Sequence, residues 1–151
     1  MSWAAERVDA KECAFLFDEV PFKARPRYDG RSGRTYTPRK TADAEKRIRA
    51  AWAEKNGSRF AGFEGEVRVS IEIQRPLAKS NPKRWVGRAD LMKPDADNVA
   101  KLVCDSLNGV AYKDDSQVTK LSVSFRPRVS HGLQCRIWVR VEYYAEIYVK
   151  E

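Results

Sequence analysis

The sequence is poor in the residues on which several common enzyme chemistries depend. It contains one histidine, His131, inside the turn-like segment Ser130-His131-Gly132. A single histidine excludes a zinc site or any other metal motif that is built on paired histidines. The sequence also has no glycine-rich loop of the Walker type, so a nucleotide-driven activity is not indicated and no nucleotide cofactor is expected.

Cysteines and long apolar runs are scarce as well. Cys13, Cys104 and Cys135 form no C-x-x-C pair, which favours reduced thiols in or near the core over a metal or redox role. No apolar run approaches the roughly 18 residues of a membrane span. No charged-then-apolar leader opens the chain. We therefore expect a cytoplasmic protein that does not associate with a membrane.

Acidic residues are the minority among the charged side chains. The chain has 29 Lys and Arg against 21 Asp and Glu, which gives a formal net charge of +8. A basic protein of this kind attracts polyanions such as nucleic acids. Hydrophobic residues make up 42% of the 151 residues, enough for a packed core. We expect a single domain over residues 1–151.

The hydrophobic pattern predicts strands and helices in nearly equal measure. Alternating apolar residues indicate strands at residues 12–20, 67–74, 119–126 and 135–143. Apolar residues at helical spacing indicate one helix from Thr41, interpreted as its N-cap, to Asn56, and another over residues 97–107. The turn at residues 130–132 suits an antiparallel hairpin between the last two strands. We expect an α+β fold, with a small mixed or antiparallel sheet of about four strands and two helices on one face.

Acidic residues concentrate around the second predicted helix, in the segment Lys93–Val118. Asp95 and Asp97 lie at its start, and Asp114 and Asp115 follow its end. Each pair has a structural explanation of its own, since an Asp at a helix start caps free N–H groups and an acidic turn can simply be solvated. Together, four carboxylates that a helix and its return could gather suit Mg²⁺, which prefers oxygen ligands and keeps several waters.

Lys101 and Asp105 follow Asp97 along the same side of this helix, at intervals of four residues. The ammonium of Lys101 can form an ordinary surface ion pair with Asp97. Alternatively, it can contact a scissile phosphate, as cations do in phosphoryl transfer. Asp105 lies two turns from the helix start, so we expect it to be a salt-bridge partner rather than a metal ligand.

This ordered set of motifs resembles the RusA family of Holliday-junction resolvases. The resemblance is carried by Asp95-Ala96-Asp97-Asn98-Val99-Ala100-Lys101, by Asp105–Val110 and by Lys113–Val118, with a weaker similarity over Pro21–Ala50. It implies a small homodimeric α+β endodeoxyribonuclease that binds four-way branched DNA in recombination and repair. Such an enzyme cuts two opposing strands symmetrically with Mg²⁺ or Mn²⁺. By position, the resemblance implies catalytic roles for Asp95, Asp97, Asp115 and Lys101, and a metal site of Asp95, Asp97, Asp114 and Asp115.

Two turn-rich stretches are expected to bind DNA: the first basic segment, residues 21–40, and the second basic segment, residues 75–93. The candidate DNA-binding residues are Lys23, Arg25, Arg27, Arg31, Arg34, Lys40, Lys83, Arg84, Arg88 and Lys93. Tyr28 and Tyr36 are interleaved with them and suit stacking on exposed bases. A run of charge can also be no more than a solvated face.

Three functions remain open on the sequence. The first is a metal-dependent junction endonuclease, and the second is a nuclease for other branched or flap DNA. The third is a non-catalytic basic DNA-binding module whose acids are only caps and turns. For the implied homodimer, the surface around Trp138 and Tyr144 is a candidate contact.

Overall fold

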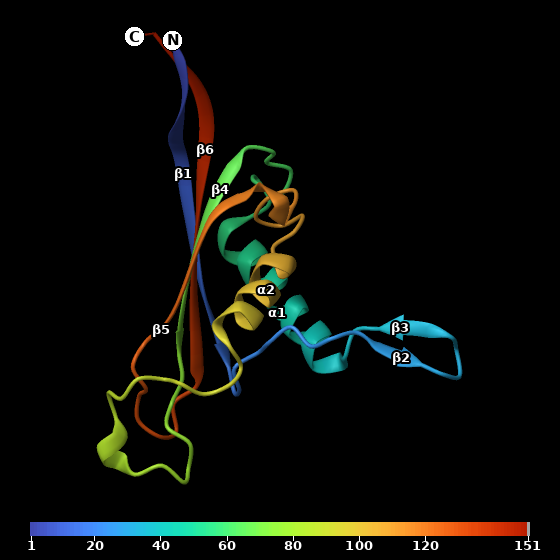
Figure 1. Ribbon diagram of the computed structural model, residues 1–151, viewed down its shortest axis with the longest axis vertical. Helices are drawn as coiled ribbons and strands as arrows, with labels where there is room; N and C mark the ends of the chain where they lie inside the picture. Colours follow the sequence, from blue (N-terminus) through green and yellow to red (C-terminus); the bar gives the residue numbers. More distant parts are fainter. Residues whose placement is uncertain (151) are drawn as a thin grey trace.

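The computed structural model describes residues 1–150 and contains a four-stranded mixed sheet with two helices on one face (Figure 1). The strands are β1 (Ser2–Phe17), β4 (Glu66–Gln74), β5 (Val118–Phe125) and β6 (Cys135–Val149), in the order β1-β6-β4-β5. The helices are α1 (Arg39–Asn56) and α2 (Ala96–Ser106). A small hairpin of β2 (Arg27–Asp29) and β3 (Arg34–Tyr36) and two short 3-10 helices, η1 (Lys83–Trp85) and η2 (Asp115–Gln117), complete the fold. The predicted α+β class is confirmed.

The core lies between the sheet and the helices because apolar side chains alternate along the two central strands. These core side chains are Val67, Val69, Ile71, Ile73, Ile137, Val139, Val141 and Tyr143, each at most 1% exposed. α1 contributes Ile48 and Trp52, and α2 contributes Val99, Leu102 and Val103. The two helices therefore bury the apolar faces that their periodicity predicts.

The predicted hairpin between the last two strands is wrong. β5 pairs in parallel with β4, and β6 lies antiparallel between β1 and β4. Residues 126–134 cross the end of β4, where Leu77 N donates a hydrogen bond to Val129 O (2.8 Å) and Arg126 N donates one to Ile73 O (2.7 Å). β6 takes the central position because alternate residues along most of its length are buried, whereas β5 is largely exposed and suits an edge.

β4, α2 and β5 form a crossover unit. Because β4 and β5 run in the same direction, α2 must run back along the sheet between them. The chain enters α2 near the end of β4, where Arg75 Nη1 donates to Lys93 O (2.7 Å). It leaves α2 toward the start of β4, where Lys113 N donates to Phe63 O (3.1 Å). The acidic pairs that flank α2 in the sequence therefore lie toward opposite ends of the sheet.

Two predicted boundaries are also wrong. α1 begins at Arg39, and Thr41 does not cap it. The Thr41 hydroxyl instead accepts a hydrogen bond from Ala24 N and donates one to Phe22 O, each 3.2 Å long. β1 begins at Ser2, well before its predicted start. Its first half pairs with the end of β6 without burying alternate side chains, so it lacks the pattern that reveals a half-buried strand.

The β2–β3 hairpin and the paired ends of β1 and β6 extend from the body in Figure 1. The hairpin lies within the stretch predicted to be a loop, and its ladder joins Arg27 to Tyr36 and Asp29 to Arg34. Across residues 1–150, neither helix has the length and apolar character needed to span a membrane.

Candidate metal and nucleic-acid site

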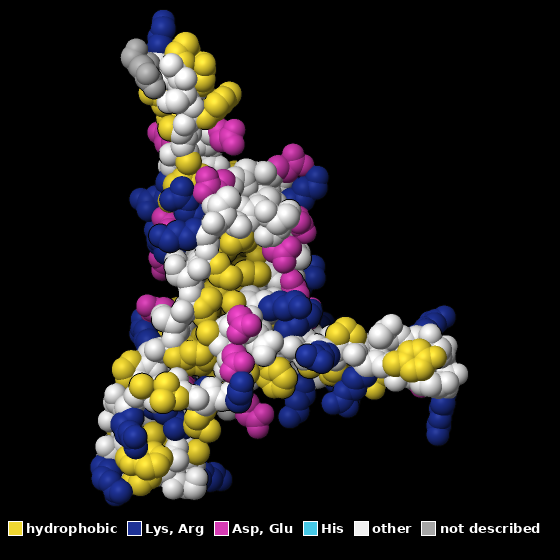
Figure 2. Space-filling model, in the orientation of Figure 1, with side chains coloured by type: hydrophobic (Ala, Val, Ile, Leu, Met, Phe, Trp, Pro, Cys, Tyr) yellow, Lys and Arg dark blue, Asp and Glu magenta, His cyan; other side chains and the backbone are white. Residues whose placement is uncertain are grey.

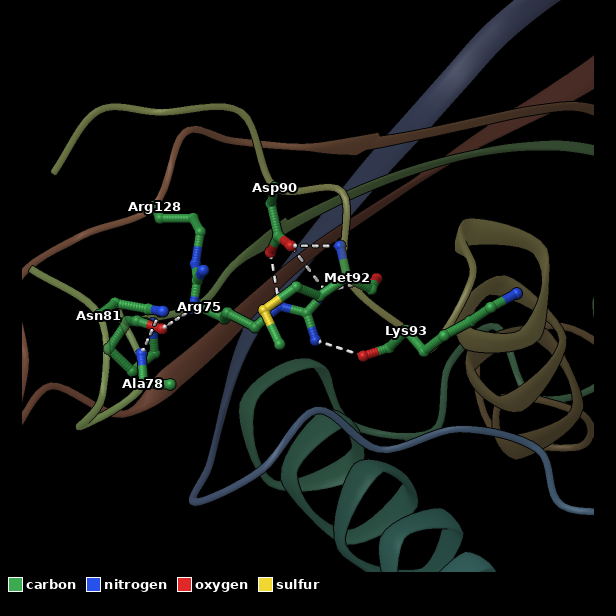
Figure 3. Close-up of polar contacts among 8 residues, drawn as sticks. Arg75, Ala78, Asn81, Asp90, Met92, Lys93 and Arg128 are labelled. Atoms are coloured by element: carbon green, nitrogen blue, oxygen red, sulfur yellow. Dashed lines mark hydrogen bonds and ion pairs between the residues drawn. The ribbon is translucent and has the colours of Figure 1, made fainter. Parts of the chain in front are cut away.

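The start of α2 is held by an arginine of the second basic segment, which was expected to bind DNA but is directed inward. Arg75, just after β4, donates to the two carboxylate oxygens of Asp90 at 2.5 and 2.8 Å (Figure 3). It also donates to the carbonyls of Met92 (2.8 Å) and Lys93 (2.7 Å). The side chain of Asp90 is fully buried, and that of Arg75 is 11% exposed. This bidentate pair fixes the backbone that leads into α2.

Asp95 and Asp97 lie at the first turn of α2 with different neighbours. Asp95 is the N-cap residue, yet within residues 1–150 its carboxylate makes no capping hydrogen bond. It instead accepts hydrogen bonds from Lys93 Nζ at 2.8 and 3.0 Å. Asp97 is exposed and, with Lys101, lines a cavity of about 400 Å³ between α2 and β5. Helix capping by side chains therefore does not account for this acidic pair.

The turn after α2 is braced against the start of β4. Lys113 forms an ion pair with Glu64 at 2.7 Å. Gln117 Nε2 donates to the carbonyls of Phe63 (2.6 Å) and Gly65 (2.8 Å). These contacts fix both ends of the segment that carries Asp114 and Asp115.

Asp114 and Asp115 differ in what their side chains contact. Asp114 Oδ2 accepts a hydrogen bond from Ser116 N (3.1 Å) at the cap of η2, and its hydrogen bonds with Ser116 lower the pKa of Asp114. The carboxyl group of Asp115 instead interacts with that of Asp105, near the end of α2. Burial, followed by the adjacent carboxyl groups of Asp105 and Asp114, raises the pKa of Asp115. Asp114 therefore stabilises the turn, and Asp115 is the member of the pair that faces the helix.

The acidic side chains form two groups rather than one. From Asp97 to Asp105 the helix rises about 12 Å, at about 1.5 Å per residue. Asp95 and Asp97 thus lie at one end of α2, and Asp105 and Asp115 lie at the other. In the part of the chain that the structure describes, no three Asp, Glu, His or Cys side chains are close enough to hold a metal ion.

The chemistry of these donors nevertheless fits Mg²⁺ or Mn²⁺. Mg²⁺ commonly keeps several waters and is held by one or two carboxylates together with substrate phosphates. Asp105 and Asp115 bring two carboxyl groups within hydrogen-bonding range, an arrangement that a nearby cation stabilises. Each acidic group of one chain thus offers two carboxylates to a hydrated divalent ion: Asp95 and Asp97 at the start of α2, and Asp105 and Asp115 at its other end.

The first basic segment is exposed along most of its length. Figure 2 shows Lys and Arg side chains gathered on the projecting hairpin. The exposed cations of this segment are Arg25, Arg27, Arg31, Arg34, Arg39 and Lys40. Tyr28 is 69% exposed and Tyr36 is 48% exposed. Lys23 differs from the rest, because its Nζ contacts Glu45 (2.7 Å) and Asp105 (3.2 Å) inside the molecule. The ion pair with Lys23 agrees with the expectation that Asp105 is a salt-bridge partner.

The second basic segment is folded onto residues 126–134. Gly87 N donates to Arg128 O (2.9 Å), Arg128 N donates to Arg88 O (3.0 Å), and a ring nitrogen of His131 lies 2.8 Å from Asn81 O. The only histidine of the chain thus braces a loop. The exposed cations here are Lys79, Lys83, Arg84, Arg88 and Lys93. The guanidinium of Arg88 lies 4.7 Å from the ring centre of Trp85.

One feature of the sequence could have indicated the Arg75–Asp90 pair. Asp90 is the only acidic residue in residues 75–93. A lone carboxylate among cations is a candidate for an internal ion pair, because a buried charge needs a partner. The sequence does not say which of the neighbouring cations that partner is.

Comparison with known proteins identifies the family of this chain. Residues 19–142 match the family described as Endodeoxyribonuclease RusA. The chain therefore belongs to the RusA family, as its motifs indicate. A stretch of 68 residues is 43% identical to the "Uncharacterized protein YqaN" of Bacillus subtilis (strain 168), which covers 40% of this chain and 48% of that protein. The chain thus spans about half the length of this curated relative.

Proposed function

We propose that the protein is a Mg²⁺-dependent endodeoxyribonuclease that resolves four-way DNA junctions by symmetric paired nicking, in recombination and repair in the cytoplasm. The observation that carries this proposal is the family match over residues 19–142, which includes the acids around α2, Lys101 and both basic segments. Figure 2 supports it: acidic side chains lie over the start of α2, between the basic hairpin and the basic loop that carries η1. Cations on both sides of an acidic site suit phosphate binding around a scissile bond.

The acidic residues and Lys101 would have different roles in hydrolysis. Asp95, Asp97 and Asp115 would hold the divalent ion, which when bound polarises a phosphoryl oxygen and eases deprotonation of the attacking water. Lys101 contacts a non-bridging oxygen of the scissile phosphate and stabilises the charge that develops there. The water oxygen bonds to phosphorus, the bond from phosphorus to the 3′ oxygen breaks, and that oxygen takes up a proton. The products are a 5′-phosphate and a 3′-hydroxyl, which a ligase can reseal.

A two-fold dimer would bring together the two acidic groups, which lie far apart within one chain. If two α2 helices packed antiparallel about the axis, the partner's Asp115 would approach Asp95 and Asp97 of the first chain. The cavity beside α2 supports this choice, because it forms a groove between α2 and β5, lined in part by Ala96, Leu121 and Val123, against which a second chain can pack. Two such composite sites, related by the axis, would cut two strands at equivalent positions.

The sequence-based candidates for the dimer contact lie elsewhere. Trp138 and Tyr144 are on the face of the sheet that the helices leave uncovered. The guanidinium of Arg126 lies 3.9 Å from the ring centre of Trp138, and that of Arg68 lies 4.0 Å from the ring centre of Tyr144. Both rings are thus already covered by cations, so we favour the α2 surface for the dimer.

A cleavage assay on labelled four-way junction, fork, flap and duplex DNA, with and without Mg²⁺, tests the function. We expect paired nicks in opposing strands of the junction, and only with the metal. Preferred cutting of flaps or forks would support the alternative branched substrates. Binding without cutting under any condition would support the non-catalytic module.

Mixing two inactive variants tests the composite site. Asp97→Asn and Asp115→Asn should each cut very slowly alone, because each variant dimer lacks one acid in both sites. A heterodimer of the two carries one site with both substitutions and one wild-type site, so it should regain nicking of a single strand. Light scattering should give twice 17.3 kDa for the wild type. An inactive mixture of proven heterodimers would place each site within one chain.

A further inference from the structure

Lys23 belongs to the first basic segment, but its charge is directed inward. Its Nζ lies 2.7 Å from Glu45 Oε1 on α1 and 3.2 Å from Asp105 Oδ2 on α2. The side chains of Lys23, Glu45 and Asp105 are only 21%, 23% and 27% exposed. The backbone N–H of Lys23 also donates to Asn98 O at 3.3 Å. Lys23 therefore joins the two helices, whereas the cations that follow it face solvent.

Asp105 contacts Lys23, and it also faces the acidic site. Its carboxyl group is a neighbour of Asp115 and interacts with it, and the proposed function assigns Asp115 to the divalent ion. Two neighbouring carboxylates repel each other unless a cation offsets one of them. Lys23 is placed to do this for Asp105 without contacting Asp115. A chain of contacts thus runs from Glu45 through Lys23 and Asp105 to Asp115.

We propose that Lys23 is a positioning residue of the acidic site: by holding Asp105, it keeps Asp115 oriented for the divalent ion, and it does not bind DNA. This inference rests on the proposed function, because it takes Asp115 as a metal ligand. Removing the ammonium would leave the half-buried carboxylates of Glu45 and Asp105 facing each other without a cation. Asp105 would then be free to turn and disturb Asp115.

Binding of Mn²⁺ to the DNA-free protein, followed by electron paramagnetic resonance, measures the acidic site without cleavage. Lys23→Met keeps the aliphatic stem and removes the charge, and we expect it to weaken Mn²⁺ binding about tenfold, as loss of a group that orients a ligand does. Lys23→Arg should retain most of the affinity because it restores a cation. Arg25→Met is the matched control: Arg25 is exposed, so this substitution should leave Mn²⁺ binding unchanged.

A second substitution separates charge pairing from a folding defect. If Lys23 acts by offsetting the charge of Asp105, then adding Asp105→Asn to Lys23→Met should restore Mn²⁺ affinity to within about threefold of the wild type. A general folding defect would not be rescued by removing another polar contact. A double variant that binds Mn²⁺ no better than Lys23→Met would overturn the inference.

Junction binding in EDTA over a range of salt concentrations separates positioning from DNA contact. Each phosphate contact contributes about 0.9 to the slope of log affinity against log salt. Lys23→Met should keep the wild-type slope, whereas Arg25→Met should lower it; a reduced slope for Lys23→Met would refute the assignment. A wild type that neither binds Mn²⁺ nor cuts junctions would overturn the proposed function and this inference together. Wild-type cutting with unchanged Mn²⁺ binding by Lys23→Met would overturn this inference alone.

Discussion

The two basic segments share a composition but are built in opposite ways. The first projects as a hairpin whose ladder has three residue pairs, and Tyr28 on it is 69% exposed. The second is folded onto residues 126–134 around the buried pair of Arg75 and Asp90. A short two-stranded hairpin is marginally stable by itself, whereas a buried bidentate ion pair fixes the backbone around it. We infer that the hairpin can adapt to a ligand, which is branched DNA under the proposed function, and that the second segment is preformed.

The largest expected effect is a loss of stability when the buried ion pair of the second basic segment is broken. Asp90→Asn removes one partner of a buried ion pair, which costs about 3–5 kcal/mol. Thermal unfolding should therefore begin at a much lower temperature. The matched control is Asp29→Asn on the hairpin, where Asp29 hydrogen-bonds only the local turn through Arg31 N and Ser32 Oγ. Equal Tm values for Asp90→Asn and the wild type would contradict the contrast between the segments.

The next largest effect is expected on the cleavage rate, and it should leave DNA binding by the two basic segments unchanged. Asp97→Asn should lower the single-turnover cleavage rate by about 10²–10³-fold, the usual loss when a group that stabilises the transition state is removed. The junction Kd should change little because neither basic segment is touched. Asp114→Asn is the control, since Asp114 caps η2, and it should retain more activity. A parallel loss of binding and cutting by Asp97→Asn would mean that this acid shapes the DNA surface.

A smaller effect concerns the aromatic side chains of the two segments. Tyr28→Ala should weaken junction binding by about 1–3 kcal/mol if the ring stacks on one base. Trp85→Ala should cost less, because the guanidinium of Arg88 already lies 4.7 Å from that ring centre. Fluorescence anisotropy with junction and duplex DNA measures both. Tyr28→Phe should bind like the wild type, and a loss equal to that of Tyr28→Ala would assign the contact to the hydroxyl.

The smallest expected effect is on stability as a function of pH. Burial and the neighbouring carboxyl groups raise the pKa of Asp115 in the folded state. The folded state therefore favours the protonated acid, and this contribution is present at low pH and lost as the pH rises through the raised pKa. Asp115→Asn should raise the Tm at pH 7 in EDTA, with the gain vanishing near pH 3. A lower Tm at pH 7, measured by differential scanning fluorimetry, would contradict the crowding of these acids.

Local sequence patterns predicted the positions of the helices and strands better than they predicted which strands pair with each other. The alternation in β4 and the helical spacing in α2 both fall on buried residues, so sequence alone placed these elements correctly. The pairing of β5 and β6 was wrong because an alternating strand looks the same beside a parallel or an antiparallel partner. The first half of β1 was missed because its ladder is made with β6 and its side chains are exposed.

The site was predictable as a set of residues but not as a geometry. Asp97 and Lys101 could be singled out by their spacing, yet the separation of the acids depends on α2 running back between parallel strands. The contacts of Lys23 could not be predicted either. Its partners, Glu45 and Asp105, come from different helices and meet only once those helices pack.

Arg75 joins the end of β4, the second basic segment and the backbone before α2 through one guanidinium. A local opening fluctuation at any of these three places must break the same buried ion pair. The amides of Leu77 and Gly87, which donate to carbonyls of residues 126–134, would therefore exchange their hydrogens for deuterium slowly and together, as one cooperative unit. The amides of β2 and β3 do not share this restraint. The second basic segment would thus open only together with the approach to α2.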